Sequence, residues 1–382
     1  MIFLYYIIIF TMYLTILIPC LNEEKTILYC INKAKKFLHK FRKKSEILIV
    51  DNGSSDKTIL IAKKNGARVV VEYSKGYGSA LITGIKNARG KYIVMGDADG
   101  SYDFSNLNPF IEKFNENYDV VCGNRFKGGI EKNAMPFLHK YLGNPVLSFL
   151  GRLLFPLKLG DFHCGLRGFK RSKVLSLDLQ TTGMEFASEM LVKSGLNKFK
   201  ICEVDVKLYK DKRDRKPHLK TWSDGWRHLT FLFFHAPKWL FIIPGSLLTL
   251  IGLTLYLLTI KGTFFLSDKI NLDIFSLYAG CIMILIGSQL NIFGIFAKIL
   301  SQKKQETFYK VNTILLYSAT FFFLLSILGI YISINYWLEN NYNFVNYKIL
   351  GRYLITAGSL LLLSFQIFIN LILFNFLRKN IS

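Results

Sequence analysis

Four long apolar segments follow Pro237, and they limit the folds available to the second part of the chain. Each is close to the roughly 20 residues that an α-helix needs to cross a bilayer. The segments are Leu240–Ile260, Ile274–Ile295, Thr313–Trp337 and Leu354–Leu377. We therefore expect residues 238–382 to form an all-α transmembrane domain of four helices, because a helix satisfies its own backbone hydrogen bonds in lipid.

The distribution of basic residues around these segments predicts an orientation. Cations gather between the second and third segments and after the fourth: Lys298, Lys303, Lys304, Lys310, Arg378 and Lys379. The loop from Lys261 to Asp273 is charge-balanced. The positive-inside rule then places the N-terminal domain and the C-terminus in the cytoplasm. Lys348 and Arg352 fall on the outer side in this arrangement and do not fit it.

The overall charge points to anionic partners. The chain of 382 residues has a formal net charge of +23, although 51% of its residues are hydrophobic. No zinc spacing, basic zipper or aromatic RNA-binding signature accompanies this charge, so nucleic acid is not expected. Anionic membrane lipids and phosphorylated substrates are the better partners. The six cysteines have no paired spacing, which argues against a zinc site or a disulfide framework.

Residues 12–237 have the pattern of an α/β domain. Short strand-like runs alternate with helical stretches: Thr15–Pro19, Glu24–Phe41, Glu46–Val50, Lys57–Lys64, Ala67–Glu72 and Lys91–Met95. This alternation is typical of a mainly parallel, Rossmann-like sheet. The uncharged stretch Ile2–Ile18 resembles a membrane anchor, but we favour a first strand at its end, with Met12 as a possible start.

Polar clusters follow three of these strands, at the sheet edge where ligands bind. Asp97 and Asp99 flank Ala98 after a hydrophobic run, so their side chains project to the same side and can share a divalent cation, Mg²⁺ or Mn²⁺. That cation could neutralise a diphosphate leaving group. Asp51 can accept hydrogen bonds from a nucleotide base and Glu23 from ribose hydroxyls. Lys75 and Gly76 form a small-residue turn where a ligand can approach the backbone.

In their order and spacing, these motifs resemble the family 2 glycosyltransferases with a GT-A fold. Within that family, they are similar to polyprenyl-phosphate sugar transferases such as dolichyl-phosphate mannose synthase. The resemblance covers roughly Leu14 to Trp226. Its motifs are Pro19…Asn22-Glu23-Glu24, Val50-Asp51-Asn52-Gly53-Ser54-Ser55-Asp56, Lys75-Gly76-Tyr77-Gly78 and Gly96-Asp97-Ala98-Asp99. It implies a nucleotide-sugar donor bound near Pro19, Asn22 and Ala98, a divalent metal, inversion at the anomeric carbon and a polyprenyl-phosphate acceptor.

The chain departs from the mannose synthase pattern after Asp99. Those enzymes look like Asp-Ala-Asp followed by Leu, a polar residue, His and two prolines, whereas here Gly100-Ser101-Tyr102-Asp103-Phe104 follows. Mannose is therefore not implied. Ser101 takes the place of the polar residue that assists the metal.

The second half of the domain supplies candidates for the acceptor side. Arg125, in Gly123-Asn124-Arg125, and Arg167, near the segment that begins at Asp161, are candidate ligands of the acceptor phosphate, although a structural ion pair is an equal alternative for each. Asp161 is a candidate organiser of this region. Residues 137–159 mix long apolar side chains with cations, as in a helix lying in the membrane interface or packed on the sheet.

A basic segment over residues 207–237, expected as a juxtamembrane loop, precedes the first apolar segment. In the related enzymes, a mobile loop at this place closes over the donor diphosphate. The resemblance therefore makes four side chains candidate clamps: Arg213, Arg215, His218 and Lys220.

The acceptor type decides whether a catalytic base is needed. A phosphate monoester is already anionic at neutral pH, so it needs no dedicated base. A lipid or glycan hydroxyl would need one, with Asp161 or another carboxylate as the candidate. A processive polysaccharide synthase is disfavoured because only Gly225-Trp226-Arg227 stands where such chains carry Gln-x-x-Arg-Trp. A nucleotide-binding transporter or scaffold is disfavoured by apolar segments almost without ionisable residues. The sugar, nucleotide, polyprenol and possible homo-oligomer stay open.

Overall fold

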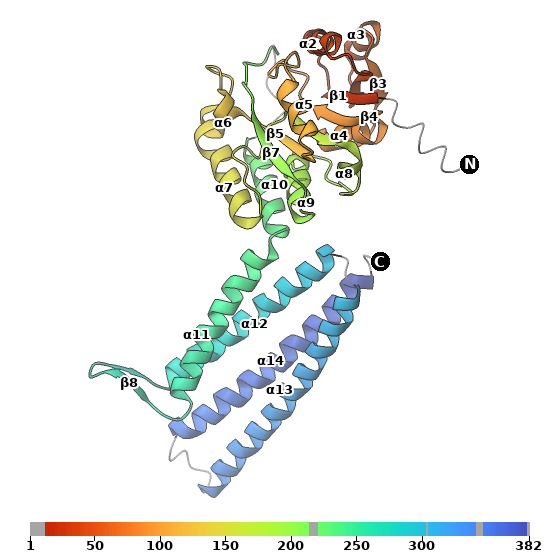
Figure 1. Cartoon of the computed structure of the whole chain (residues 1–382). Helices are drawn as coiled ribbons and strands as arrows, with labels where there is room; N and C mark the ends of the chain where they lie inside the picture. The colour runs from red at the N-terminus through yellow and green to blue at the C-terminus, as the bar shows by residue number, and fades with distance from the viewer. Residues whose placement is uncertain (1–11, 214–220, 303–304, 341–346, 380–382) are drawn as a thin grey trace. The chain divides into compact units, whose positions relative to one another are not determined.

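The computed structural model describes residues 12–213, 221–302, 305–340 and 347–379. The chain divides into two compact units, Met1–Leu232 and Phe233–Ser382. This division lies within five residues of the boundary expected at 237. Figure 1 shows the helices and strands of both units, coloured along the chain.

A seven-stranded sheet forms the centre of the first unit, in the order β3-β2-β1-β4-β6-β5-β7. The strands are β1 (Met12–Cys20), β2 (Ser45–Asp51), β3 (Arg68–Val71), β4 (Gly90–Met95), β5 (Val120–Asn124), β6 (Arg167–Lys170) and β7 (Ile201–Asp205). Only β6 runs antiparallel to its neighbours, β4 and β5. The expected mainly parallel α/β fold is confirmed, and β1 is the strand predicted at the end of the apolar N-terminal stretch.

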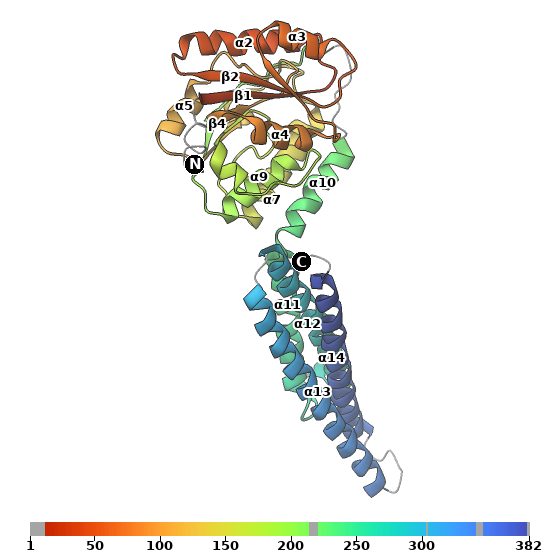
Figure 2. The ribbon, with the colours of Figure 1, turned by 90° about the vertical axis from the view of Figure 1, so that its right-hand side faces the viewer.

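Helices cover both faces of this sheet, so the central strands are apolar on both sides. Figure 2 shows α2 (Ile27–Lys40) and α3 (Thr58–Lys64) on one face and α4 (Tyr77–Asn87) on the other. Ile16 of β1 belongs to the core that includes Ile31 of α2. The next residue, Leu17, lies so close to Gly84 of α4 that a Cβ there would come within 2.4 Å of it. The alternation of side chains along β1 therefore fixes both layers.

The remaining helices of the first unit are short and lie mainly in its second half. They are α5 (Asn108–Asn115), α6 (Arg125–Gly128), η1 (His139–Gly143), α7 (Asn144–Leu154), α8 (Arg171–Leu175), α9 (Phe186–Leu196) and α10 (Thr221–Phe234). Elements η1 and α7 occupy most of residues 137–159. Helix α10 lies within residues 207–237, which we predicted as a basic loop. The cations that suggested a loop come before α10, whose own sequence is rich in aromatic and apolar residues.

The second unit consists of long apolar helices, as expected. They are η2 (Lys238–Ile242), α11 (Ile243–Thr259), α12 (Ile274–Gln302), α13 (Gln305–Glu339) and α14 (Tyr347–Lys379). Within the described residues, four stretches are long and apolar enough to cross a membrane: Lys238–Thr259, Ile274–Ile299, Phe308–Glu339 and Lys348–Leu377. Helix α11 packs along α12 and α13 along α14, while α12 also contacts α14.

Two features of this unit were not expected from the sequence. A β-hairpin, β8 (Phe264–Ser267) and β9 (Ile270–Leu272), connects α11 to α12. At its base, Asp273 binds both cations that did not fit the predicted orientation. Its Oδ2 lies 2.8 Å from Lys348 Nζ, and its Oδ1 lies 2.5 Å from an Arg352 guanidinium nitrogen. These ion pairs tie the beginning of α14 to the residue before α12, and the orientation itself stays a prediction.

Candidate functional site

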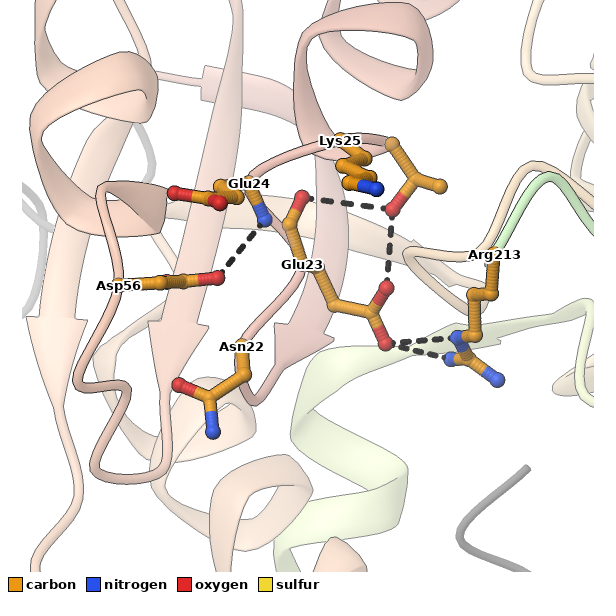
Figure 3. Close-up of a pocket in the computed structure, with 7 residues that line it drawn as sticks. Asn22, Glu23, Glu24, Lys25, Asp56 and Arg213 are labelled. Atoms are coloured by element: carbon orange, nitrogen blue, oxygen red, sulfur yellow. Dashed lines mark hydrogen bonds and ion pairs between the residues drawn. The ribbon is translucent and has the colours of Figure 1, made fainter. Parts of the chain in front are cut away.

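The loops after β1 and β2 are tied together at the carboxyl edge of the sheet. The backbone N–H of Asn22 donates to Ser54 Oγ at 2.8 Å, and its side-chain oxygen accepts from Ser55 N at 2.8 Å. Glu23 N donates to Thr58 Oγ1 at 2.8 Å. Asn22 has a φ of 56°, a left-handed conformation that asparagine adopts more readily than most residues. These contacts hold the loop of Asn22 and Glu23 against the loop after β2. Figure 3 shows the side chains of both residues.

Asp51 ends β2 and closes the turn that follows it. Its Oδ2 accepts from Gly53 N at 3.0 Å and from Ser54 N at 2.9 Å, while Oδ1 lies 3.7 Å from Cys20 Sγ. The side chain is fully buried. Pro19 lies beside Val50 on the neighbouring strand. The contact of Asp51 with a nucleotide base stays a prediction, with Oδ1 as the oxygen outside the turn.

The glycine turn before α4 approaches another backbone segment closely. Gly76 has a φ of 136°, and a Cβ there would lie 2.2 Å from the carbonyl oxygen of Thr182. Its N–H donates to Asn52 Oδ1 at 2.7 Å. Only glycine fits this position without a backbone shift. Lys75, one residue before, is exposed, and its contact with a ligand stays a prediction.

Asp97 and Asp99 lie together after β4, as predicted. Asp97 Oδ1 accepts from the Tyr77 hydroxyl at 3.0 Å. Asp99 Oδ1 accepts from both Ser101 N at 2.9 Å and Ser101 Oγ at 2.6 Å. Burial, together with the charge of Asp99, raises the pKa of Asp97 to about 6. The carboxylates therefore repel each other enough for a cation to stabilise the pair. Ala98 between them is buried.

These two carboxylates fit a divalent cation only together with a ligand that supplies more oxygens. Within the described part of the chain, no group of three His, Cys, Asp or Glu side chains could hold a metal ion. Mg²⁺ is commonly bound by one or two carboxylates plus substrate phosphates, so the pair suits a metal–diphosphate complex. Ser101 supports Asp99 through two hydrogen bonds in which it is the donor. The lone pairs of its hydroxyl oxygen are not used in them, and its role as a metal ligand stays a prediction.

Arg213 connects the basic segment to the acidic edge. Its Nε and a terminal nitrogen lie 2.8 and 2.7 Å from Glu23 Oε1, and a second terminal nitrogen lies 3.2 Å from Asp99 Oδ2. Figure 3 shows the Glu23 carboxylate turned toward this guanidinium at a pocket. The pocket is lined by Asn22, Glu23, Glu24, Lys25, Thr26, Asp56 and Arg213. The predicted clamps Arg215, His218 and Lys220 lie outside the described residues.

Arg125 and Asp161 form a buried, two-pronged ion pair. Arg125 Nε lies 2.6 Å from Asp161 Oδ2, and a terminal nitrogen lies 2.8 Å from Oδ1. Asp161 is fully buried, and it also accepts from the backbone N–H of Arg125 at 3.1 Å. Burial alone would lower the pKa of Arg125, but Tyr102 and Asp161 outweigh it and raise it above its ordinary value. Arg125 is therefore held in its charged form, and Asp161 is its partner in the ion pair.

Arg167 has a different environment from the one that an acceptor ligand requires. It is fully buried, and its guanidinium donates to the backbone carbonyl oxygens of Cys164 at 2.9 Å, Ala187 at 2.6 Å and Phe162 at 2.5 Å. These bonds hold the segment after Asp161 against α9. The contact of Arg167 with an acceptor stays a prediction without support from this geometry.

Two sets of residues at the site were missed by sequence reasoning. Tyr77 and Tyr102 place their hydroxyls on Asp97 Oδ1 and on Gly165 N, at 3.0 and 2.9 Å. The Ser188 hydroxyl lies 2.8 Å from His228 Nδ1 and 3.5 Å from His163 Nε2, which docks α10 on α9. Tyr77 stood inside a quoted motif and could have been found, whereas nothing in the sequence pairs the histidines.

Comparison with known proteins gives a consistent result. The model described as glycosyl transferase family 2 matches residues 15–177. The low-salt glycan biosynthesis hexosyltransferase Agl6 of Haloferax volcanii is 35% identical over 292 residues, which cover 75% of this chain and 69% of that protein. Since the first unit ends at Leu232, a match of this length reaches into the second unit.

Two further relatives match a smaller part of the chain. The UDP-N-acetylglucosamine–dolichyl-phosphate N-acetylglucosaminyltransferase of Methanococcus voltae is 35% identical over 50% of this chain and 84% of its own. The dolichyl-phosphate hexose transferase of Haloferax volcanii is 31% identical over 43% and 69%. Among solved structures, glucosyl-3-phosphoglycerate synthase from Mycobacterium tuberculosis matches with a TM-score of 0.47 and 18% identity, covering 59% of this chain and 80% of that one. A structural likeness of that size carries no argument about this site.

Proposed function

The chain belongs to glycosyltransferase family 2, and from this premise we propose that it transfers a sugar from a nucleotide-diphosphate sugar to a polyprenyl phosphate of the undecaprenyl or dolichyl type. The main support is the pair of carboxylates at the carboxyl edge of a mainly parallel sheet, Asp97 half-buried and Asp99 buried, in a chain that continues into four apolar helices. The names of two relatives, which specify dolichyl phosphate, agree with this acceptor.

The acidic edge would bind the donor. Asp97 and Asp99 would hold Mg²⁺ or Mn²⁺, whose charge neutralises the departing diphosphate. Glu23 and Asp51 would contact the ribose and the base through their carboxylates. Arg213, which already lies beside Asp99, would add a charge-assisted hydrogen bond to the diphosphate.

The burial of Asp161 and its ion pair with Arg125 favour a phosphate acceptor over a hydroxyl acceptor. Both of its oxygens bind Arg125, and its side chain is fully buried, so it is badly placed to remove a proton from a hydroxyl. A phosphate monoester is already anionic and needs only alignment behind the anomeric carbon. One displacement of this kind inverts that carbon.

The membrane would present the acceptor. We place the first unit on the cytoplasmic side. Cations gather between the second and third spans and after the fourth, and in a four-span chain these places lie on the same side of the membrane as the beginning of the first span, which follows the first unit. The exposed apolar side chains on η1 and α7, such as Tyr141, Val146 and Phe149, suit a helix lying at the lipid interface. Lys140 and Lys158 nearby would meet anionic headgroups.

A transfer assay tests this function. The purified full chain in detergent would be given Mg²⁺ or Mn²⁺, one labelled nucleotide sugar at a time, and either undecaprenyl or dolichyl phosphate. We expect one donor to yield a labelled, organic-soluble product that disappears with EDTA and returns when metal is added.

The product also decides the mechanism and the acceptor class. The anomeric configuration of the lipid-linked sugar should be opposite to that of the donor. If no donor labels either lipid phosphate, while a lipid or glycan with a free hydroxyl becomes labelled, the phosphate acceptor is wrong. A chain that binds no nucleotide sugar under any of these conditions would contradict the proposed function as a whole.

A further inference from the structure

The guanidinium of Arg213 lies where the proposed cation would bind. It contacts Glu23 Oε1 at 2.7 and 2.8 Å and Asp99 Oδ2 at 3.2 Å. Glu23 and Asp99 are 4% and 8% exposed, so water screens their charges only weakly. An arginine guanidinium stays protonated in proteins and cannot give up its charge to the solvent at neutral pH. Arg213 is therefore a fully charged internal counter-ion.

The hydrogen bonds of Asp99 leave one oxygen for any cation. Oδ1 already accepts from the backbone and the hydroxyl of Ser101, at 2.9 and 2.6 Å. Oδ2 is the oxygen that faces Arg213. A divalent ion that binds Oδ2 must therefore replace the guanidinium there, because two cations cannot share one buried oxygen without strong repulsion.

The backbone around Arg213 is fastened to the same loop. Tyr209 N donates to Ser101 O at 3.0 Å, and Lys212 N donates to Asp99 O at 2.9 Å. The Lys212 side chain turns elsewhere, with its ammonium 4.6 Å from the centre of the Tyr29 ring. A movement of the Arg213 side chain is therefore enough to release Asp99, and the guanidinium stays within reach of an anion bound next to it.

From these contacts we propose that the Arg213 guanidinium occupies the cation site while no donor is bound, and that the guanidinium and the metal ion bind Asp99 alternately. The guanidinium neutralises Glu23 and Asp99 before the donor arrives. The metal–diphosphate complex then replaces it on Asp99, and Arg213 exchanges the carboxylate for a diphosphate oxygen. This inference rests on the proposed function, and it makes metal binding and nucleotide binding depend on each other.

Metal binding without any sugar transfer tests the exchange. The full chain in detergent would be titrated with Mn²⁺ alone, and free Mn²⁺ would be followed by electron paramagnetic resonance. We expect Arg213→Met to bind Mn²⁺ about tenfold more tightly than the unaltered chain, because an internal competitor is removed. Lys212→Met is the matched control: it removes one positive charge from the same segment but not from the carboxylates, and it should change the affinity far less.

Adding UDP or GDP sharpens the result. The diphosphate should tighten Mn²⁺ binding more in the unaltered chain than in Arg213→Met, since only the former regains a partner for the guanidinium. Equal Mn²⁺ affinity of Arg213→Met and the unaltered chain, or an equal gain in Lys212→Met, would overturn the exchange while leaving the proposed function intact. A failure of every variant to bind Mn²⁺, even with nucleotide present, would instead count against the metal site itself.

A second inference concerns the hairpin β8–β9, which exposes apolar side chains on both of its faces. Phe264, Phe265, Leu266 and Ile270 are 39%, 72%, 61% and 54% exposed. A two-stranded hairpin is only marginally stable in water by itself. Figure 1 shows it extending sideways from the ends of α11 and α12. These side chains therefore need an apolar surrounding.

The level of the hairpin along the helices indicates what that surrounding is. The span Lys238–Thr259 has 22 residues, so it is about 33 Å long, close to the thickness of the hydrocarbon layer. The hairpin begins five residues later. Asp273, Lys348 and Arg352, which pair at its base, belong at the headgroup level because charges avoid hydrocarbon.

The hairpin is continuous with the spanning helices. We therefore propose that it lies in the headgroup region of the leaflet that the C-terminal end of the span Lys238–Thr259 reaches. Phe265, the most exposed of these side chains, would insert toward the acyl chains, and the turn at Asp268 and Lys269 would face water. The hairpin would then hold the α11–α12 pair at a fixed depth.

Depth-dependent quenching tests this placement. An environment-sensitive label would be attached to Phe265→Cys or, as the matched control in the turn, Asp268→Cys, in proteoliposomes. The described native cysteines are buried or half-buried, and the unaltered chain gives the labelling background. We expect quenching by shallow nitroxide lipids at position 265 and by aqueous iodide at position 268. Iodide quenching at both positions, or protection of position 265 from both quenchers, would overturn the proposal.

Discussion

The two units of this chain handle buried polar groups in opposite ways. The first unit buries full charges: Asp161 pairs with Arg125, and Glu23 and Asp99 share Arg213. In the second unit, amides meet between the helices, while the buried Arg352 pairs with Asp273. Gln289 and Asn370 exchange hydrogen bonds of 3.1 and 2.8 Å between α12 and α14, and the Asp273 ion pairs lie at the helix ends. Charge is retained where a charged ligand is expected, and neutral groups hold the helices together.

Replacing Asp99 should have the largest effect, which is on sugar transfer, because both Arg213 and the proposed metal ion bind its carboxylate. We expect Asp99→Asn to lower sugar transfer at least about a thousandfold, since a site that stabilises the leaving group loses its main charge. Asp103→Asn is a close control. Asp103 Oδ1 accepts from Ser105 N and Oγ at 2.9 and 2.6 Å, the same arrangement as Asp99 with Ser101, but Asp103 faces Lys33. Equal losses in the two variants would contradict the assignment.

The Arg125–Asp161 pair should give the next largest effect, on stability. Asp161→Asn leaves a buried guanidinium without its counter-ion, so we expect a loss of about 3–5 kcal/mol in the free energy of unfolding of the first unit. The double variant Arg125→Met, Asp161→Leu should recover much of that stability, because no unpaired charge remains. Denaturant unfolding of the full chain in detergent measures both. A double variant as unstable as Asp161→Asn would mean that packing, not charge, explains the loss.

His228 should make the first unit sensitive to acid. Burial, opposed by Asp224 and assisted by Arg167, lowers its pKa to about 4. In the unfolded chain, the His228 ring takes up a proton near pH 6.5, whereas in the folded chain it does so only near pH 4. The contribution of neutral His228 to folding stability is therefore complete above pH 6.5 and is lost as the pH falls toward 4. We expect about 2–3 kcal/mol of this loss to come from His228.

Comparing the melting temperature at pH 7.5 and pH 5 checks the role of His228. His228→Asn keeps a polar group beside Ser188 and should reduce the pH dependence, while His163, which faces the same serine, retains part of it. An unchanged difference between the two pH values would show that other groups titrate instead.

The amide pair of the second unit should give the smallest effect. We expect Gln289→Leu to lower the free energy of unfolding by about 1 kcal/mol, because a hydrogen bond between two side-chain amides in the membrane contributes little net stability. The double variant Gln289→Leu, Asn370→Leu should cost less than the sum of the single changes. Unfolding in graded sodium dodecyl sulfate measures this series. A loss as large as that of Asp161→Asn would erase the contrast between the units.

Strands β1 and β4, the hairpin β8–β9 and the partners of Arg167 show what a local sequence pattern can and cannot predict. The alternation around Thr15–Pro19 and the acidic pair after Met95 predicted β1, β4 and the edge where the carboxylates meet, because strand direction fixes where each loop emerges. The hairpin β8–β9 was missed, although its apolar residues flank a polar turn, since strong neighbouring helices dominated that region. The partners of Arg167 were unpredictable because all of them are backbone carbonyl oxygens.

The sequence by itself determined the two kinds of unit and the family. Runs of about 20 apolar residues can satisfy their backbone in lipid only as helices, and short alternating elements can close only as a layered sheet. The tertiary structure alone decided which charges meet. Glu23 and Arg213 lie 190 positions apart, and Arg125 and Asp161 lie 36 apart. Such pairs depend on the packing of whole layers, so no local pattern encodes whether an arginine faces a carboxylate, a carbonyl oxygen or a future ligand.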